Sequence, residues 1–172
     1  SSVPKLSQHV YLKAKVKNET GYSLLPGPTN VFLDNSFVAS SKLDMVAPTE
    51  EFWTSLGVDE AIKISYKLIN RKRSDDGIFS KKIKTVFSYL IEVTNNRKTS
   101  EEIVIEDQLP ISGNKEMKVE LIEPKFKENS LSLKKNRHEY LEWLLELEPG
   151  ENVKIPLTFS VEYPSDKVVS GL

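Results

Sequence analysis

Alternation of apolar and polar residues between Lys82 and Pro110 constrains the fold of this chain more than any other feature. Side chains on an extended strand point to opposite faces in turn, so every second residue shares a face. The first half of this stretch places on one face Ile83, Thr85, Phe87, Tyr89, Ile91 and Val93. A polar, turn-forming segment at 94–100 follows, and Ile103 and Ile105 then resume the alternation. We therefore predict that this stretch forms the central hairpin of an all-β sandwich.

The same two-residue period predicts strands along most of the remaining chain. The predicted strands cover residues 9–20, 30–34, 37–43, 51–56, 62–73, 117–124, 141–147 and 153–163. A helix is a competing interpretation for 141–147, because Leu, Glu and Trp do not exclude one. Pro149-Gly150-Glu151 favours a strand there, since this tripeptide is typical of a hairpin turn. The polar segment 125–137 is predicted to be a long loop, and no internal repeat is apparent.

Three short motifs predict local backbone features. Asp34-Asn35-Ser36 is expected to form a turn, because Asp and Asn tolerate left-handed conformations. Asn18-Glu19-Thr20 matches the N-glycosylation sequon, which matters only in a secreted chain, and we interpret it as a turn. Pro156 lies within the last predicted strand and has no N–H to donate, so this strand is expected at a sheet edge or with a local kink.

The predicted fold class is an antiparallel β-sandwich. A chain of 172 residues can bury a sizeable core without disulfide bonds. We predict one all-β domain over residues 1–172 with two possible sub-parts. The first sub-part comprises N-terminal β hairpins over 9–60, and the second is an immunoglobulin-like sandwich over 61–165. The second sub-part includes a long antiparallel ribbon at 62–93 that projects beyond the body.

Composition argues against several classes of function. The chain has no cysteine, which excludes disulfides, thiolate nucleophiles and cysteine-bound zinc. The 24 Lys and Arg residues nearly balance 25 Asp and Glu residues, whereas nucleic-acid binding normally needs a basic surplus. No apolar run approaches the roughly 20 residues that span a bilayer. We expect no nucleic-acid or membrane partner, no cofactor, no metal and a cytoplasmic location. Because the sequence starts with Ser1, an excised domain is expected.

Candidate catalytic residues do not form a known constellation. Neither His9 nor His138 lies in a metal-ligand or nucleophile motif. Pairs of adjacent acids occur at Asp59-Glu60, Asp75-Asp76, Glu101-Glu102 and Glu106-Asp107. Glycosidase carboxylates must converge across a cleft, whereas adjacent acids at strand ends are usually solvated. We expect no enzymatic activity.

The two tryptophans have different expected environments. Trp143 is in phase with Leu141, Leu145 and Leu147, so it is predicted to lie in the core. Trp53 is out of phase with Phe52 and is the better candidate for an exposed, sugar-stacking side chain.

The tip of the predicted ribbon, at 70–84, is the candidate interaction site. Cations and apolar residues gather there on both sides of a turn, namely Arg71, Lys72, Arg73, Ile78, Phe79, Lys81 and Lys82. One interpretation is a partner contact in which Phe79 is the buried anchor and the cations attract an acidic surface. The competing interpretation is a solvated turn whose lysines prevent aggregation.

Several short blocks resemble a known family. They are Asn18-Glu19-Thr20-Gly21-Tyr22, Leu24-Leu25-Pro26-Gly27-Pro28, Asn30-Val31-Phe32, Ser55-Leu56-Gly57-Val58-Asp59-Glu60, Asp107-Gln108-Leu109-Pro110, Val161-Glu162-Tyr163-Pro164 and Val169-Ser170-Gly171-Leu172. Together they resemble the C-terminal domain of mucoidy-inhibitor-A-like proteins over nearly the whole chain. The resemblance implies a β domain that follows a coiled-coil segment outside this fragment, and it implies no catalytic residues.

These observations lead to two functional hypotheses. The first is a non-enzymatic module that mediates contacts with a protein partner, with other domains of its own chain or with copies of itself, through the 70–84 tip. The alternative is a carbohydrate-binding domain, suggested by the sandwich class, by Trp53 and by the polysaccharide phenotype behind the family name.

Overall fold

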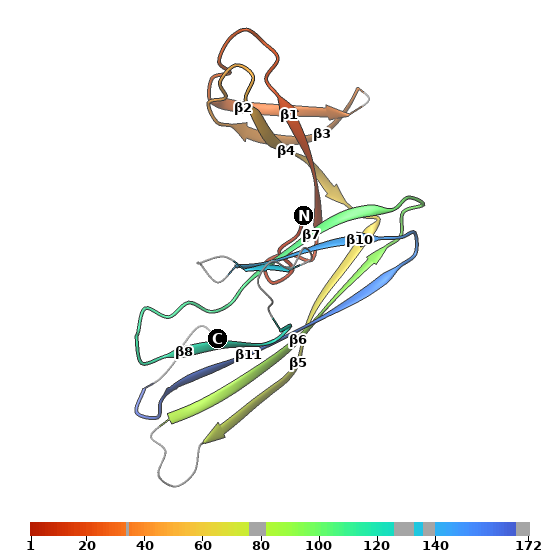
Figure 1. Cartoon of the computed structure of the whole chain (residues 1–172). Coiled ribbons are helices and arrows are strands. Elements are labelled where there is room, and N and C mark those ends of the chain that lie inside the picture. Colours follow the sequence, from red (N-terminus) through yellow and green to blue (C-terminus); the bar gives the residue numbers. More distant parts are fainter. Residues whose placement is uncertain (34, 76–81, 126–132, 136–139, 168–172) are drawn as a thin grey trace. The chain divides into compact units, whose positions relative to one another are not determined.

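A computed structural model of the chain describes residues 1–33, 35–75, 82–125, 133–135 and 140–167 (Figure 1). Every regular element in these ranges is a β-strand, which confirms the all-β class. The strands are β1 Val10–Lys17, β2 Gly27–Leu33, β3 Ser36–Leu43, β4 Glu51–Asp59, β5 Ile62–Asp75, β6 Lys82–Asn95, β7 Glu101–Gln108, β8 Lys118–Glu123, β9 Leu133–Lys135, β10 Tyr140–Leu147 and β11 Asn152–Pro164. The loop predicted over 125–137 is wrong at β9, where three residues pair with β10.

The chain forms two compact units. Unit 1 contains Ser1 and His9–Glu60, and unit 2 contains Ser2–Gln8 and Ala61–Leu172. Val10 and Val46 are the buried hydrophobic residues among those described in unit 1. The described buried hydrophobic residues of unit 2 include Ile91, Ile105 and Leu141, which are almost fully inaccessible. The larger described core therefore belongs to unit 2.

Unit 2 contains a four-stranded sheet of order β5-β6-β11-β8 and a three-stranded sheet of order β7-β10-β9. The two-sheet arrangement fits the predicted sandwich. If β5 to β11 are lettered A to G in chain order, the two sheets have the strand orders A-B-G-D and C-F-E. The corresponding sheets of the immunoglobulin constant fold are ABED and CFG. The fifth and last strands have thus exchanged places. In addition, Ser2 extends the edge of β7, because its N–H donates to the Val104 carbonyl at 2.9 Å.

The central hairpin predicted over 82–110 is wrong, although both of its strands exist. β6 pairs with β5 and β11 in one sheet, and β7 pairs with β10 in the other. The polar segment between them therefore crosses from sheet to sheet. The turn at Pro149-Gly150-Glu151 makes the same crossing between β10 and β11, so it is not a hairpin turn either. Alternation identifies a strand and its buried face, but it does not identify the strand's partner.

The ribbon predicted at 62–93 is present as β5 and β6. Its pairing runs from Ile62 opposite Asn95 to Asp75 opposite Ile83. The ribbon is also part of a wider sheet, since β11 pairs along β6 as far as Pro164 opposite Lys82. Residues 76–81, at the predicted tip, lie outside the described residues.

The missing N–H of Pro156 removes no backbone hydrogen bond from the described strand pairing. It lies opposite Leu90 of β6. On the other side of β11, the described pairing with β8 begins at Thr158. The expectation that this strand lies at a sheet edge is wrong, because β11 lies between β6 and β8, but Pro156 itself precedes the described part of β11 that pairs with β8.

Unit 1 is built from two two-stranded sheets, β1-β4 and β2-β3. β1 and β4 are antiparallel from Val10 opposite Asp59 to Lys17 opposite Glu51, with a bulge opposite Leu12 and Lys13. Gly57 at this bulge has a φ of 96°, and a Cβ built there would lie 3.2 Å from the Val38 carbonyl of β3. The β2-β3 turn contains Asn35 at a φ of 63°, which confirms the predicted left-handed turn residue.

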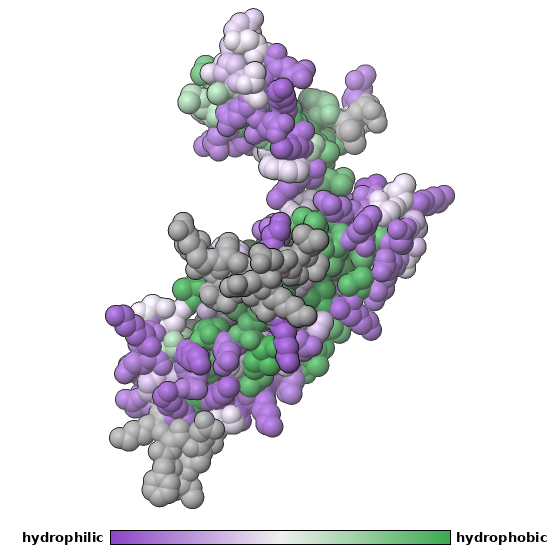
Figure 2. Space-filling model, viewed as in Figure 1, coloured by the Kyte–Doolittle hydropathy of each residue, from purple (hydrophilic) through white to green (hydrophobic). Residues whose placement is uncertain are grey.

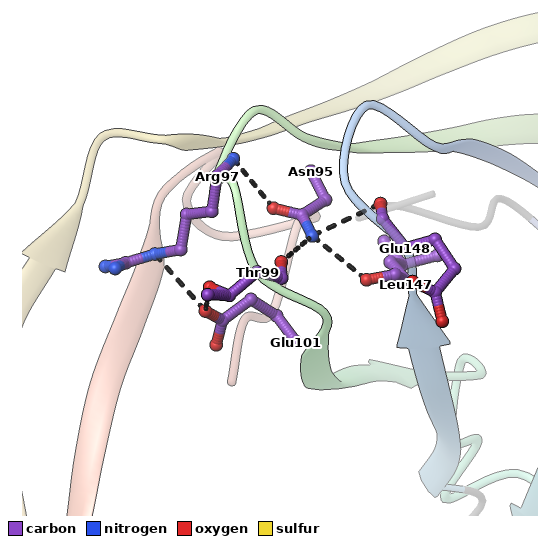
Figure 3. A network of polar contacts seen from close by, with 6 residues as sticks. All are labelled: Asn95, Arg97, Thr99, Glu101, Leu147 and Glu148. Carbon is purple, nitrogen blue, oxygen red and sulfur yellow. Dashed lines mark hydrogen bonds and ion pairs between the residues drawn. The ribbon is translucent and has the colours of Figure 1, made fainter.

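A buried asparagine clamps the corner where unit 2 crosses between its sheets (Figure 3). The Asn95 amide Nδ2 donates to the carbonyls of Thr99 and Leu147 at 2.9 Å each and of Glu148 at 3.3 Å. Its Oδ1 accepts the Arg97 N–H at 2.9 Å. One side chain thus joins the end of β6, the segment before β7 and the end of β10.

Unit 1 contains the same clamp at Asn18. The Asn18 Nδ2 donates to the carbonyls of Tyr22 at 2.9 Å, Ala47 at 3.0 Å and Val46 at 3.3 Å, and its Oδ1 accepts the Thr20 N–H at 3.1 Å. In both clamps the asparagine donates from Nδ2 to a carbonyl four residues on and to two adjacent carbonyls of a distant segment. The Asn18-Glu19-Thr20 turn is confirmed, and it is part of a clamp.

The distant segments of the two clamps also correspond residue by residue. Val46-Ala47-Pro48-Thr49-Glu50 matches Leu147-Glu148-Pro149-Gly150-Glu151. The Glu50 side chain accepts the Ala47 N–H, and the Glu151 side chain accepts the Glu148 N–H. Thr49 and Gly150, the residues before these glutamates, both have a positive φ. The two units therefore share one local clamp motif, although their sheets differ in number and order of strands.

Candidate functional site

The outer face of the β1-β4 sheet in unit 1 combines lysines with an exposed tryptophan. Lys13, Lys15 and Lys17 alternate along β1, and all three side chains are exposed. Trp53 of β4 lies opposite Lys15 and is 65% exposed. Directly opposed residues of an antiparallel pair share a face. We call these four residues the lysine–tryptophan face.

One carboxylate already contacts this face. Glu51 of β4, opposite Lys17, forms an ion pair with the Lys15 ammonium group. Both side chains are about half exposed, so the surrounding water weakens the attraction. Two of the three lysines therefore carry charge that Glu51 does not offset. The face can attract anions, and Trp53 can contact apolar or planar groups.

An exposed aromatic pair marks the end of the β2-β3 hairpin. Phe32 and Phe37 are opposed across the hairpin, with ring centroids 5.8 Å apart in an edge arrangement. They are 61% and 57% exposed. Hydrophobic side chains reach the surface of unit 1 in Figure 2. Sequence reasoning missed this pair, although two phenylalanines flanking the Asp34-Asn35 turn were a visible signal.

The structure divides the described cations of the predicted 70–84 site between two faces of β5 and β6. Arg71 and Arg73 lie opposite the buried Phe87 and Thr85, and the Arg71 guanidinium is 5.1 Å from the Phe87 ring centre. Lys72 lies opposite Val86, on the other face. Lys82 shares that other face and donates to Glu162 at 2.7 Å, which raises the pKa of Lys82. Ile78, Phe79 and Lys81 lie outside the described residues.

Both tryptophan predictions are confirmed. Trp143 on β10 is buried among the core residues of unit 2, and Trp53 is largely exposed. His138 lies outside the described residues, and within them no three His, Cys, Asp or Glu side chains are grouped to hold a metal ion.

Asp107 on β7 is buried, so the solvated interpretation of the acidic pair Glu106-Asp107 is wrong for this residue. Its side chain is 1% exposed. Oδ1 accepts the N–H of Gln108 at 2.7 Å, whereas Oδ2 is buried without a hydrogen-bond partner in the described part of the chain. Burial raises the pKa of the Asp107 carboxyl. The pKa of Tyr66 is also raised, mainly by burial and to a smaller extent by the negative charge of Asp107. The Tyr66 hydroxyl accompanies this carboxyl and lowers the pKa of Asp107 against the larger effect of burial.

Within the described residues there is no helix with the length and apolar character needed to cross a membrane.

Comparisons with known proteins give a family without an established activity. The chain is 28% identical over 170 residues to "Protein F37C4.5" of Caenorhabditis elegans, which covers 95% of this chain and 31% of that protein. The chain thus spans about a third of the length of this curated relative. No solved structure matches the chain. The family model described as "Domain of unknown function (DUF4139)" matches residues 1–165. The chain therefore belongs to the DUF4139 family.

Proposed function

We propose that this chain is a non-enzymatic interaction module that binds a protein partner through unit 1. The observation that carries the proposal is the concentration of exposed large hydrophobic side chains there. They are Tyr11, Val16, Tyr22, Leu25, Phe32, Phe37, Met45, Trp53 and Val58. Scattered exposed hydrophobic residues are normal on a protein surface. Paired aromatic residues at a hairpin end are better explained as anchors for a partner.

The 70–84 site is the weaker candidate for the contact. Arg71 lies over the Phe87 ring, and Lys82 is paired with Glu162. A partner would have to compete with these internal contacts. In unit 1, Phe32 and Phe37 contact each other and otherwise have more than half of their surface exposed.

Affinity capture with matched variants tests the proposal. The double variant Phe32→Ser and Phe37→Ser removes the aromatic pair, and Leu68→Ser with Ile69→Ser removes exposed apolar residues from unit 2 as a control. We expect the first variant to lose partners that the wild type and the control retain. Equal capture by all three proteins would refute a role for the Phe32 and Phe37 pair. A further variant, Arg71→Glu with Lys72→Glu, tests the 70–84 site in the same assay.

Carbohydrate binding is the second candidate, and the exposure of Trp53 favours it. An exposed aromatic ring can stack on a sugar face. Binding on a glycan array that Trp53→Ala abolishes would support this function, and an array without signal would refute it. The finer resemblance to mucoidy-inhibitor-A-like proteins is likewise a proposal, which a polysaccharide phenotype on deletion would support.

A further inference from the structure

Two serines of the chain follow an arginine by three residues. Ser74 follows Arg71, Ser100 follows Arg97, and in both cases a lysine comes directly after the arginine. Serine kinases choose their substrates largely by the pattern of charge around the serine, and an arginine at this spacing is a common part of that pattern. A kinase binds such a segment as an extended chain. The two sequences are equivalent in these respects, so only the structure distinguishes them.

The segment around Ser100 is held in a bent form (Figure 3). It lies in the crossing between β6 and β7, where the Asn95 side chain accepts the Arg97 N–H at 2.9 Å and donates to the Thr99 carbonyl at 2.9 Å. The Arg97 guanidinium lies 3.8 Å from a carboxylate oxygen of Glu101. A kinase would have to break the clamp of unit 2 before it could extend this segment.

The segment around Ser74 is already extended. Arg71 and Ser74 both belong to β5, and both are exposed. Ser74 lies one residue before the end of this strand. Strand ends open at a lower cost in free energy than strand centres do. A kinase can therefore bind this segment without disturbing the core of unit 2.

Two lysines share the face of β5 and β6 that carries the Ser74 side chain. Lys84 lies directly opposite Ser74, and the Ser74 Oγ donates to the Lys84 carbonyl at 3.3 Å. Lys72 precedes Ser74 by two residues, so its side chain lies on the same face. Glu162 lies opposite Lys84 on the β11 side and is hydrogen-bonded to Lys82 at 2.7 Å.

A phosphate on Ser74 would lie close to both lysine side chains. Directly opposed residues of an antiparallel pair have Cβ atoms about 5 Å apart, which long side chains bridge easily. The phosphate would carry about two negative charges and accept charge-assisted hydrogen bonds from Lys72 and Lys84. At Ser100 the same group would instead be followed directly by Glu101 and Glu102, whose like charges repel it.

We propose that Ser74 is a phosphorylation site for a serine kinase that selects arginine three residues earlier, and that Lys72 and Lys84 hold the phosphate. In the transfer, the Ser74 Oγ forms a bond to the γ-phosphorus of ATP while the bond from that phosphorus to the β,γ-bridging oxygen breaks. ADP leaves with the electron pair of the broken bond, and the serine proton passes to the catalytic aspartate of the kinase. Phosphorylation would offset the charge of both lysines, so it would change a cationic face into a nearly neutral one.

Labelling of the folded chain tests the site. The probe is ATP labelled at its γ-phosphate, used with the catalytic domain of a calcium/calmodulin-dependent protein kinase, and mass spectrometry of peptides locates the phosphate. We expect phosphate at Ser74, which Ser74→Ala abolishes and the matched control Ser100→Ala retains. Arg71→Lys keeps a cation over the Phe87 ring but loses the planar fork, so the initial rate should fall at least about tenfold. Arg97→Lys should leave the rate unchanged.

Phosphorus NMR of the phosphorylated chain tests the contact with the lysines. Nearby ammonium groups favour the dianionic phosphate, so it should lose its second proton at a lower pH in the folded chain than in the chain unfolded by urea. The double variant Lys72→Ala and Lys84→Ala should remove most of this difference. Lys63→Ala with Lys154→Ala removes two lysines elsewhere in the same sheet and should preserve it.

A synthetic peptide of residues 69–76 serves as the control for the kinase. Labelling of the peptide but not of the folded chain would show that the fold blocks Ser74, and labelling of neither would show that the recognition pattern fails. Labelling at Ser100 at least as fast as at Ser74 would also overturn the proposal. Identical phosphate titrations in the folded and unfolded chain would refute the role of Lys72 and Lys84. None of these outcomes bears on the contact proposed for Phe32 and Phe37 in unit 1.

Discussion

Replacing Asn95 with aspartate tests whether the clamp holds the two sheets of unit 2 together. The substitution keeps the shape of the side chain but changes a two-proton donor into an acceptor. Three carbonyls, those of Thr99, Leu147 and Glu148, then face a carboxylate at 2.9–3.3 Å instead of an amide. The Arg97 N–H keeps its acceptor. The change therefore acts on one side of the clamp alone.

The expected magnitude follows from the lost donors. Each buried carbonyl left without a partner costs about 1–3 kcal/mol. Two lost protons leave about two such groups, so we expect a loss of roughly 2–6 kcal/mol, before the cost of burying the new charge. Domains of this size are stable by about 5–15 kcal/mol. The variant should retain at most part of its stability at neutral pH.

Urea unfolding followed by Trp143 fluorescence in a Trp53→Phe background measures the change in unit 2. Burial favours the protonated form of the carboxyl introduced at position 95, so the folded state should bind its proton more tightly than the unfolded state. Stability should then rise as pH falls from about 7 to about 5. Asn95→Ala, which has no titrating group, is the matched control and should show no such recovery. A urea midpoint for Asn95→Asp within error of the wild type would refute the clamp.

Three further predictions concern single residues. Gly57→Ala should destabilise unit 1 by about 1–2 kcal/mol, because its φ is positive and the new Cβ meets the Val38 carbonyl, and faster hydrogen exchange in β4 would show this. Asp107→Asn should be more stable than the wild type at pH 7. Burial raises the folded-state pKa of Asp107, so the stability of the wild type falls as pH rises from about 3.8 through that pKa. The difference in stability between the two proteins, measured by urea unfolding, should therefore shrink on acidification. Asn18 is 2% exposed with its Nδ2 engaged, so mass spectrometry of folded protein from a glycosylating secretory host should find no glycan there.

Strand positions and buried faces were largely predictable from the sequence. Ile91, Val93, Ile103 and Ile105 are buried as the alternation indicates, because a half-buried strand must place every second side chain in the core. The pairing of each strand with its neighbours in a sheet was not predictable in the same way. The crossing of 96–100 and of 148–151 depends on hydrogen bonds between segments far apart in sequence, which a local period does not contain.

The candidate site was predictable in part. Trp53 was expected to be exposed because it is out of phase with its apolar neighbours, and it is. The cations at 71–73 looked like one cluster, but consecutive residues on a strand alternate between faces, so Lys72 is separated from Arg71 and Arg73. Asp107 shows the same limit in the core, since only tertiary packing buries a charged residue that follows Glu106.

The paired asparagine clamps have a consequence for how such chains can diversify. Asn18 reaches a carbonyl 28 residues away, and Asn95 reaches one 52 residues away, yet the bonds made at the two ends are the same. The hydrogen bonds of the clamp therefore do not depend on the length of the chain segment between the asparagine and the distant carbonyls. Since lengthening a loop costs little free energy, new hairpins could be inserted behind either asparagine during evolution or by design, while the crossing itself stays fixed.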